Sequence, residues 1–300
     1  MNLSEQKSET TQLLLAAQDR LYAKAKANIW LLYLASAVPF IALLFRPFIP
    51  SLDHLLAVVG VLGLIIGFAM EQWTKKRVET AARIQEEVDL RIYGNSLPPN
   101  EGLTGGKVGE QITVDAAGDY RLPDHRLPWY SAVIEKVTEP SVQVVLCQRE
   151  NAAWDWRTKN YIASRLTYLL FILIVLVFII GIFSKDSASQ ALNARQLVLS
   201  IIVPASALIF KTWQLRQSFY ETGKARQSLD EEIMQEIEKF KKIRQPILPD
   251  RLRIFQDKIY KTRLENCIVP DWLHERLQVG LQKNTTKSTE MIVTEINKTV

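Results

Sequence analysis

The densest group of side chains able to do chemistry lies in residues 147–157, whose sequence is Cys-Gln-Arg-Glu-Asn-Ala-Ala-Trp-Asp-Trp-Arg. Guanidinium groups form bidentate hydrogen bonds with phosphates, and indole faces stack on nucleobases. This stretch therefore predicts binding of a nucleotide-like anion. The candidate contacts for that ligand are Gln148, Arg149, Asn151, Trp154 and Arg157.

A structural role is the alternative for the same residues. On a helix, Gln148, Asn151 and Asp155 share one face, so they could bridge neighbouring cytosolic helices just before a membrane span. The two indoles at positions 154 and 156 would then lie near the membrane surface, where tryptophan is enriched. From the residues alone, both interpretations stay open.

Other chemical motifs are weak or absent. Residues 102–108 come nearest to a phosphate-binding loop, but they lack its first glycine and the hydroxyl residue after the lysine, so we expect a flexible linker. The three histidines form no pair at metal-ligand spacing, and Cys147 and Cys267 are too isolated to predict a disulfide or a zinc site. We therefore predict no catalytic residue, no metal and no enzyme.

The elements that must position the candidate residues are set by hydropathy. Hydrophobic residues make up 48% of the 300 residues, and they gather into runs nearly free of charge. A bilayer core requires about 20 apolar helical residues, so each run predicts a transmembrane helix, although the fourth could instead be a buried or re-entrant helix. The four runs are Ile29–Phe45, Leu55–Met70, Leu166–Phe183 and Leu197–Phe210.

Charge predicts the orientation of these helices. The loops Arg46–His54 and Ser184–Gln196 carry few cations, whereas the opposite flanks carry many, so both hairpins should point outward with both termini in the cytoplasm. The first 28 residues carry both charge signs and do not resemble a cleavable signal peptide. The net charge of +5 is modest and gives no reason to expect a DNA or RNA partner.

Small residues and prolines mark the spans. Gly60, Gly63 and Gly67 lie on the second run, where the last two form a small-xxx-small pair that allows close helix packing, either within one subunit or between subunits. Pro39 and Pro204 should kink their helices. No Asp, Glu, Lys or Arg lies in the middle of a span, which weakens the interpretation of the chain as an ion-coupled transporter.

Helical periodicity continues outside the membrane. Apolar residues at three- and four-residue steps run from Val78 to Ile92 and again from Leu229 to Ile243, and these stripes should pack on each other, with another subunit as an open alternative partner. Gly94 should end the first of these helices. Between Gly94 and Pro128 the composition predicts an irregular connection with room for one hairpin around residues 111–114.

Further helices are expected around prolines. One should run from Trp129 toward Val137, and another should start after Pro140 and lead into the third span. Near the end of the chain, Leu252–Glu265 and Asp271–Gln282 predict two short helices followed by a frayed tail.

Together these patterns predict an all-α membrane protein with four transmembrane helices in two hairpins and long helical cytoplasmic extensions. The expected parts are an N-terminal cytoplasmic helix at 1–28, hairpin 1 at 29–70, a central cytoplasmic segment at 71–165, hairpin 2 at 166–213 and C-terminal cytoplasmic helices at 214–300.

Several of these stretches together resemble one known family. Residues 147–157, Trp129-Tyr130, Ile254–Tyr260 and Val269–Trp272 are similar to the SMODS-associating four-transmembrane, pore-forming effector family of CBASS systems. The order of two hairpins around a central cytosolic segment also agrees, so the resemblance covers nearly the whole chain. The Gly-rich stretch 102–118 departs from it and is treated as an insertion.

The resemblance implies a role in bacterial anti-phage defence. In such systems a partner nucleotidyltransferase makes a cyclic nucleotide on infection, and the effector damages the inner membrane before phage can spread. We therefore expect a cyclic nucleotide as activating ligand with no other cofactor, a homo-oligomer, contact with membrane lipid, and a place in the inner membrane. The alternative is a non-conducting membrane scaffold that recruits a cytosolic protein partner through its helical extensions.

Overall fold

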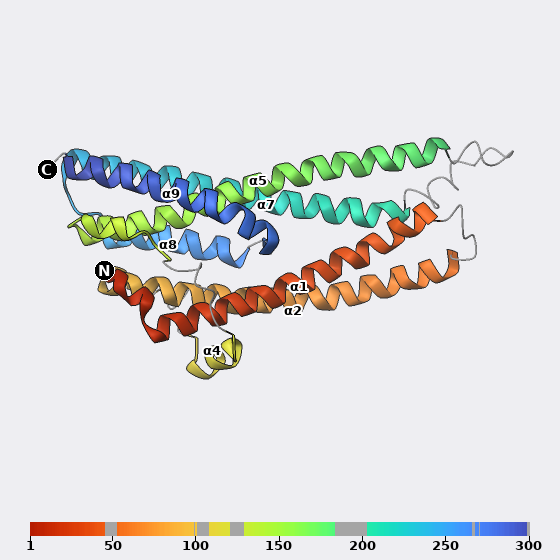
Figure 1. The fold of residues 1–300 in the computed structure, drawn as a ribbon, viewed down its shortest axis with the longest axis horizontal. Coiled ribbons are helices and arrows are strands. Elements are labelled where there is room, and N and C mark those ends of the chain that lie inside the picture. The colour runs from red at the N-terminus through yellow and green to blue at the C-terminus, as the bar shows by residue number, and fades with distance from the viewer. Residues whose placement is uncertain are drawn as a thin grey trace. The chain divides into compact units, whose positions relative to one another are not determined.

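The computed structural model describes residues 1–45, 53–98, 100, 108–120, 129–183, 203–265, 268–269 and 271–298. Over these ranges the regular structure is helical and contains no strand (Figure 1), which confirms the all-α prediction for that part of the chain. The chain divides into two compact units. Unit 1 comprises Met1–Ala25, Lys76–Asn160 and Glu221–Val300, and unit 2 comprises Lys26–Lys75 and Tyr161–Tyr220.

Four long helices contribute to both units. They are α1 (Glu9–Phe45), α2 (Asp53–Tyr93), α5 (Pro140–Phe183) and α7 (Val203–Ile243). The shorter elements belong to unit 1 and are η1 (Leu3–Lys7), η3 (Gly94–Ser96), α4 (Glu110–Ala117), η5 (Ala132–Lys136), α8 (Pro249–Leu264) and α9 (Asp271–Lys298).

Helix ends follow local signals. The carboxylate of Glu139 accepts a hydrogen bond from Ser141 N at 3.3 Å, and Pro140 occupies the first helical position, so α5 begins as the sequence predicts. Gly94 follows the last residue of α2 with φ +57°, a left-handed conformation that glycine adopts without steric cost, and it ends α2 as expected.

The core of unit 1 is one contiguous apolar cluster. The stripe on α2 contributes Val88 and Ile92, and the stripe on α7 contributes Ile233 and Ile237, all with no exposed surface. The two predicted stripes therefore pack into a single core within this chain. In the same unit α7 lies close to α5, because a Cβ atom added at Gly223 would come within 2.6 Å of Asn160 Oδ1.

Two local predictions were wrong. Residues 111–114, expected as part of a hairpin, lie in α4, because Gln111 bonds Asp115 one turn later and Arg20 Nη1 donates to Ala117 O at 2.9 Å at the helix end. The segment after Trp129 forms only the short 3-10 helix η5, which ends at Lys136.

The C-terminal tail was also predicted incorrectly as frayed. Helix α9 continues through Lys298, because its residues Ile292, Val293 and Ile296 belong to the core of unit 1. Helix α8 matches its prediction more closely, with Pro249 in its first turn.

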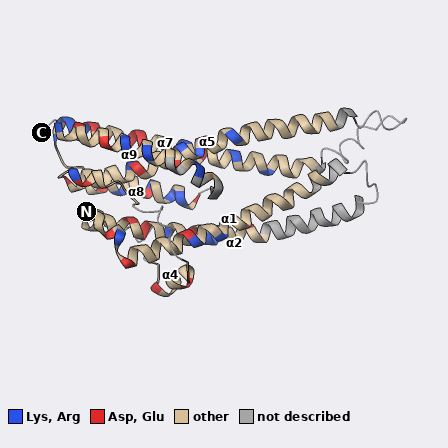
Figure 2. Cartoon of the chain, viewed as in Figure 1, with Lys and Arg blue, Asp and Glu red and all other residues tan. Residues whose placement is uncertain are grey.

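Unit 2 exposes apolar side chains. On α5, Phe171 and Phe178 are 66% and 69% exposed, while Phe40, Leu173 and Ala205 form a small buried cluster. Among the described residues one helix, α5, is long and apolar enough to cross a membrane, and only 17% of its most apolar window is buried. Beyond Arg165, α5 carries no charged residue (Figure 2).

All four predicted spans remain predictions, and the third coincides with the apolar part of α5. Residues 46–52 and 184–202, which hold most of both expected loops and the start of the fourth span, lie outside the described residues. The backbone is helical at the residues singled out for packing, whose contacts also remain predictions: Pro39 in α1, Gly60, Gly63 and Gly67 in α2, and Pro204 in α7.

Candidate ligand site

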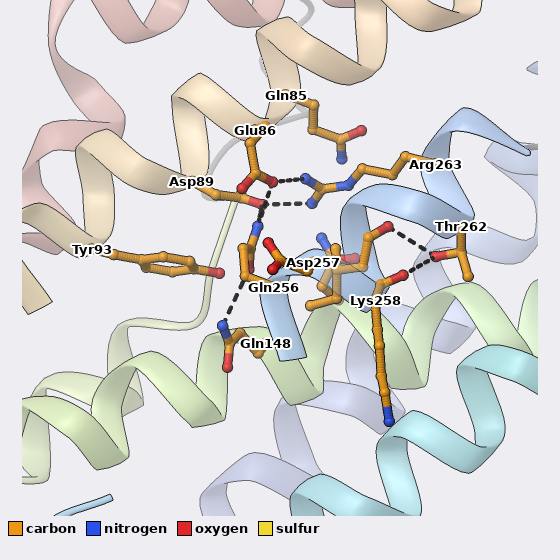
Figure 3. Close-up of polar contacts among 12 residues, drawn as sticks. Gln85, Glu86, Asp89, Tyr93, Gln148, Gln256, Asp257, Lys258, Thr262 and Arg263 are labelled. Atoms are coloured by element: carbon orange, nitrogen blue, oxygen red, sulfur yellow. Dashed lines mark hydrogen bonds and ion pairs between the residues drawn. The ribbon is translucent and has the colours of Figure 1, made fainter. Parts of the chain in front are cut away.

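The candidate stretch 147–157 lies on the unit 1 part of α5, where its polar side chains enter three different groups of contacts. The first group surrounds Gln148, which has no exposed surface. Its Nε2 donates to Leu252 O at 2.9 Å and to Gln256 Oε1 at 3.2 Å, both on α8 (Figure 3). Two of the four stretches that carry the family resemblance, 147–157 and Ile254–Tyr260, therefore contact each other directly, although they are about a hundred residues apart.

Gln256 extends this contact to a pair of buried carboxylates on α2. Its Nε2 donates to Glu86 Oε2 at 2.7 Å and to Asp89 Oδ2 at 3.0 Å. Arg263 Nη2 lies 2.6 Å from the same Asp89 oxygen, and Arg253 Nη2 lies 2.9 Å from Glu86 Oε1. This network joins α2, α5 and α8.

Burial and the opposite charges in this network shift the pKa values of its side chains. Burial raises the pKa of Glu86, and the nearby Arg263 only partly offsets that effect. Burial also lowers the pKa of Arg263, but the carboxylates of Asp89 and Glu86 outweigh it and raise that pKa above its usual value. Charges paired in this way hold α2 and α8 in one arrangement, because separating them would leave a buried charge without its partner.

The second group surrounds Asp155. Its Oδ2 lies 2.8 Å from Lys159 Nζ and 3.0 Å from Arg226 Nε, while Arg226 Nη1 donates to Asn151 Oδ1 at 3.2 Å. Burial raises the pKa of Asp155, but Lys159 and Arg226 outweigh it, so that pKa lies below its usual value. Burial lowers the pKa of Arg226 to about 10. This group ties α5 to α7.

The third group contains Arg149 and reaches the surface. Arg149 Nε lies 3.4 Å from Asp230 Oδ1, and Trp156 Nε1 donates to Asp230 Oδ2 at 3.3 Å. The guanidinium carbon of Arg157 lies 5.4 Å from the Trp156 ring centroid. Arg149 is buried, whereas Trp156 and Arg157 are partly exposed. The partly exposed cation–π pair of Arg157 and Trp156 is therefore connected through Asp230 to the buried guanidinium of Arg149.

Helix α9 covers this third group. Arg149 Nη2 donates to Ser288 Oγ at 2.9 Å, but Arg149 Nη1 has no hydrogen-bond partner among the residues that the structure describes. The same holds, within those ranges, for Glu150 Oε1 and for the hydroxyls of Thr285 and Thr289, both on α9. Buried polar atoms without partners are costly, and a guanidinium beside a hydroxyl suits a phosphate oxygen.

The five predicted contacts thus separate. Arg149 and Arg157 lie in one group around Asp230, and Trp154 is partly exposed on the same helix. Gln148 and Asn151 serve the other two groups, where α8 and Arg226 engage them. Because Gln148 and Asn151 bond to α8 and α7, they hold in place the helix that carries Arg149.

Sequence reasoning missed several members of these groups. Asp230 and Ser288 come from α7 and α9, far from residue 149 in the chain, and no local pattern connects them. A signal did exist for Glu86 and Asp89, because both lie beside the apolar stripe on α2 at helical spacing, where a charge is expected to need a partner.

Metal ligands and thiols concern other residues than these three groups. Over the described ranges, no group of three or more His, Cys, Asp or Glu residues could hold a metal ion. Cys147 is a buried free thiol whose pKa is raised well above its usual value by burial and then by Glu150 and Asp89, so it is protonated and unreactive. Cys267 lies outside the described residues.

Comparison with known proteins gives one family match. A family model described as the SMODS-associating 4TM effector domain matches residues 3–292. The chain is also 20% identical over 220 residues to a probable CBASS effector molecule of Bacillus cereus (strain VD146), an alignment that covers 73% of this chain and 70% of the relative. No solved structure gives a significant match to the chain.

Proposed function

The chain belongs to the SMODS-associating 4TM effector family, and on that premise we propose that it is a membrane effector of bacterial anti-phage defence. A cyclic nucleotide, made by a partner nucleotidyltransferase, activates it, and the activated chains oligomerise and permeabilise the inner membrane. The family match supports membrane association and an effector role, and the relative's name supports the CBASS context. Neither points to an enzymatic activity.

The proposed membrane part is the pair of hairpins at 29–70 and 166–213, with the segments 1–28, 71–165 and 214–300 in the cytoplasm. The exposed apolar surface of α5 supports this assignment, because such a surface is stable only against lipid or another apolar partner. The helices carry no charge in mid-span, so a conducting path would form between subunits or by disturbance of lipid.

The proposed ligand site is the third polar group of unit 1. The observation that carries it is the buried Arg149 guanidinium, whose Nη1 lacks a partner among the described residues. Arg149 and Arg157 would bind phosphate oxygens, and the partly exposed indoles of Trp154 and Trp156 would contact a base. Gln148 and Asn151 would act indirectly, through the helix contacts that position Arg149.

Activation requires that the ligand bind the assembled state more tightly than the resting state. Moving a population from 1% to 99% assembled takes a difference in affinity of about 10⁴-fold between the two states. If α9 must shift before a ligand phosphate can reach Arg149 Nη1, that hydrogen bond forms only in the shifted state. It would then supply part of the difference in ligand affinity between the assembled and resting states.

The test is membrane potential in cells that make both the protein and the cyclic nucleotide. We expect depolarisation with the ligand, none without it, and loss of the response in Arg157→Gln, which changes a partly exposed residue and should leave the fold intact. Arg251→Gln, which removes a partly exposed cation from α8, is the matched control and should respond as the wild type does. Undisturbed potential in cells that contain wild-type protein and ligand contradicts the proposal.

Oligomerisation is tested separately by size analysis of the purified chain in detergent, with and without candidate cyclic nucleotides. An unchanged size with a ligand that depolarises cells would remove assembly from the proposal.

The scaffold alternative has less support. It needs the stripe around Ile233 and Ile237 as a surface for a partner, and both side chains have no exposed surface. Substituting them would unfold unit 1 under either function, so these positions do not discriminate between the two.

A further inference from the structure

Cations and exposed aromatic residues gather at one end of unit 2. On each of its four helices, the residues that adjoin the unit 1 segments in sequence carry a Lys or Arg and at least one aromatic ring, and an apolar run lies next to them on the side away from the unit 1 segment. We name this set the collar. Its members are Lys26 and Trp30 on α1, Trp73 and Lys75 on α2, Tyr161, Arg165 and Tyr168 on α5, and Lys211, Trp213, Arg216 and Tyr220 on α7.

Contacts within unit 2 place these segments at one level. Asn28 Nδ2 on α1 donates to Thr74 Oγ1 on α2 at 3.2 Å. Arg216 Nε on α7 donates to Thr167 Oγ1 on α5 at 3.3 Å. Each contact joins two helices beside their collar residues.

A third contact joins the two helix pairs. Lys211 Nζ on α7 lies 3.9 Å from Glu71 Oε2 on α2. The collar is therefore a band around four helices, and it is not a set of unrelated positions along the chain.

The aromatic rings of the collar face outward. Trp73 is 61% exposed and Tyr168 is 62% exposed. Two of the cations lie over rings, Arg165 over Tyr161 and Arg216 over Tyr220, each at 5.0 Å from the ring centroid. Exposed indole and phenol rings with adjacent cations are typical of the headgroup layer of a bilayer, where a ring can be partly buried while its polar edge and the cation stay hydrated.

The charge of the collar selects the kind of headgroup. The segments 26–30, 71–75, 161–168 and 210–220 contain five cations and one acidic residue, Glu71, which gives a net charge of +4. Each Lys or Arg near an anionic membrane surface contributes about 1 kcal/mol of attraction at moderate salt. Zwitterionic headgroups offer no such net attraction.

We propose that the collar binds the headgroups of anionic phospholipids, in the leaflet at which the four helices continue into their unit 1 segments. This inference rests on the proposed membrane span of unit 2 and adds a lipid class and a depth to it. Trp30, Trp73 and Trp213 then lie at the boundary between headgroups and acyl chains, and Arg165 and Arg216 pair with lipid phosphates.

The test uses the fluorescence of these tryptophans. The full chain is reconstituted into bilayers of phosphatidylcholine mixed with either brominated phosphatidylglycerol or brominated phosphatidylcholine, whose bromines quench tryptophan on contact. We expect the relative binding constant for the anionic lipid to be about 3-fold above that for the zwitterionic lipid, and to fall toward 1 at high salt because added ions screen the attraction.

Two double variants locate the effect. Arg165→Gln with Arg216→Gln should bring the relative binding constant close to 1. Arg251→Gln with Lys258→Gln removes the same charge from α8 in unit 1 and should keep the wild-type preference. The first of these cations also lies over an aromatic ring, that of Phe255 at 5.0 Å, so the control matches the chemistry as well as the charge.

The possible outcomes separate this inference from the proposed function. Equal quenching by both lipids, or an unchanged preference in the collar variant, overturns the anionic selectivity and leaves the membrane span standing. Absence of quenching by either lipid overturns the span itself.

Discussion

Unit 1 buries charged side chains, whereas unit 2 exposes apolar ones. In unit 1 the side chains of Lys159, Arg226 and Arg263 are at most 2% exposed, each beside a carboxylate. In unit 2 the exposed positions of α5 include several phenylalanine, leucine and isoleucine residues. Burying a charge is tolerable only with a partner, and a large exposed apolar surface requires lipid or another apolar partner. The two regions of one chain therefore place different demands on their surroundings.

The largest effect is expected from breaking the ion pairs of unit 1. Arg263→Met leaves Asp89 and Glu86 buried with reduced compensation, so it should lower the free energy of unfolding by about 3–5 kcal/mol. Thermal unfolding of the detergent-solubilised chain measures this loss. Arg91→Met, which removes a partly exposed partner of Glu87 on the same α2 helix, is the control and should cost below about 1 kcal/mol. Equal losses in both variants would contradict the importance of burial.

The next effect should come from placing a charge on the apolar surface of unit 2. Ile174→Arg, in the uncharged part of α5, should cost about 2.5–3.5 kcal/mol of insertion free energy and reduce the membrane-bound fraction of the protein. Ile254→Arg places the same residue on an exposed position of α8 in unit 1 and should leave that fraction unchanged. Membrane fractionation with immunoblotting compares the two. If the first variant inserts normally, the lipid-facing assignment of α5 is wrong.

A smaller, pH-dependent effect is expected at Asp155. Asp155→Asn keeps one oxygen acceptor for Lys159 and Arg226 but loses the charge, so it should cost about 1.5–3 kcal/mol near neutral pH. The pKa of Asp155 is lowered in the folded state, so its stabilising contribution is present above the unfolded-state pKa of about 3.9. That contribution is lost as pH falls through the lower folded-state pKa.

The measurement is the free energy of unfolding of wild type and Asp155→Asn as a function of pH. The difference between them should shrink below about pH 4. A difference that stays constant down to pH 2 would show that Asp155 is not the titrating group.

The smallest effect tests the buried atoms under α9. Thr289 is fully buried, and its hydroxyl lacks a partner among the described residues, so Thr289→Val should be neutral or stabilise unit 1 by about 1 kcal/mol. Thr158 is equally buried, but its hydroxyl donates to Trp154 O at 3.0 Å, so Thr158→Val should destabilise by about 1 kcal/mol. Unfolding midpoints that shift in the same direction would contradict this contrast.

The sequence predicts the helices better than it predicts their partners. The start of α5 at Pro140, the end of α2 before Gly94 and the stripe through Ile233 and Ile237 follow from local signals, and the structure agrees. The helical tail through Ile296 was missed, because its few apolar residues are spread among polar ones and reveal a buried face only once the core of unit 1 exists.

The candidate site was predictable only in part. Residue types in 147–157 identify α5 as the helix that carries the polar groups, but spacing on one helix cannot say that Gln148 contacts Gln256 while Arg149 contacts Asp230. Those pairings depend on how α5, α7 and α8 pack, which is set by contacts distant in sequence. Long-range pairing of this kind leaves no local pattern.

The continuity of the long helices has a mechanical consequence. Helices α1, α2 and α5 pass between the two units at residues 25–26, 75–76 and 160–161 without a glycine or proline within a turn of those points. An unbroken helix resists bending and torsion, so we expect rotation of its unit 1 segment to be transmitted along the helix rather than absorbed at a kink. In α7 the boundary between the units lies at residues 220–221, and Gly223 follows within a turn. Because glycine weakens a helix, we expect α7 to bend most easily of the four long helices.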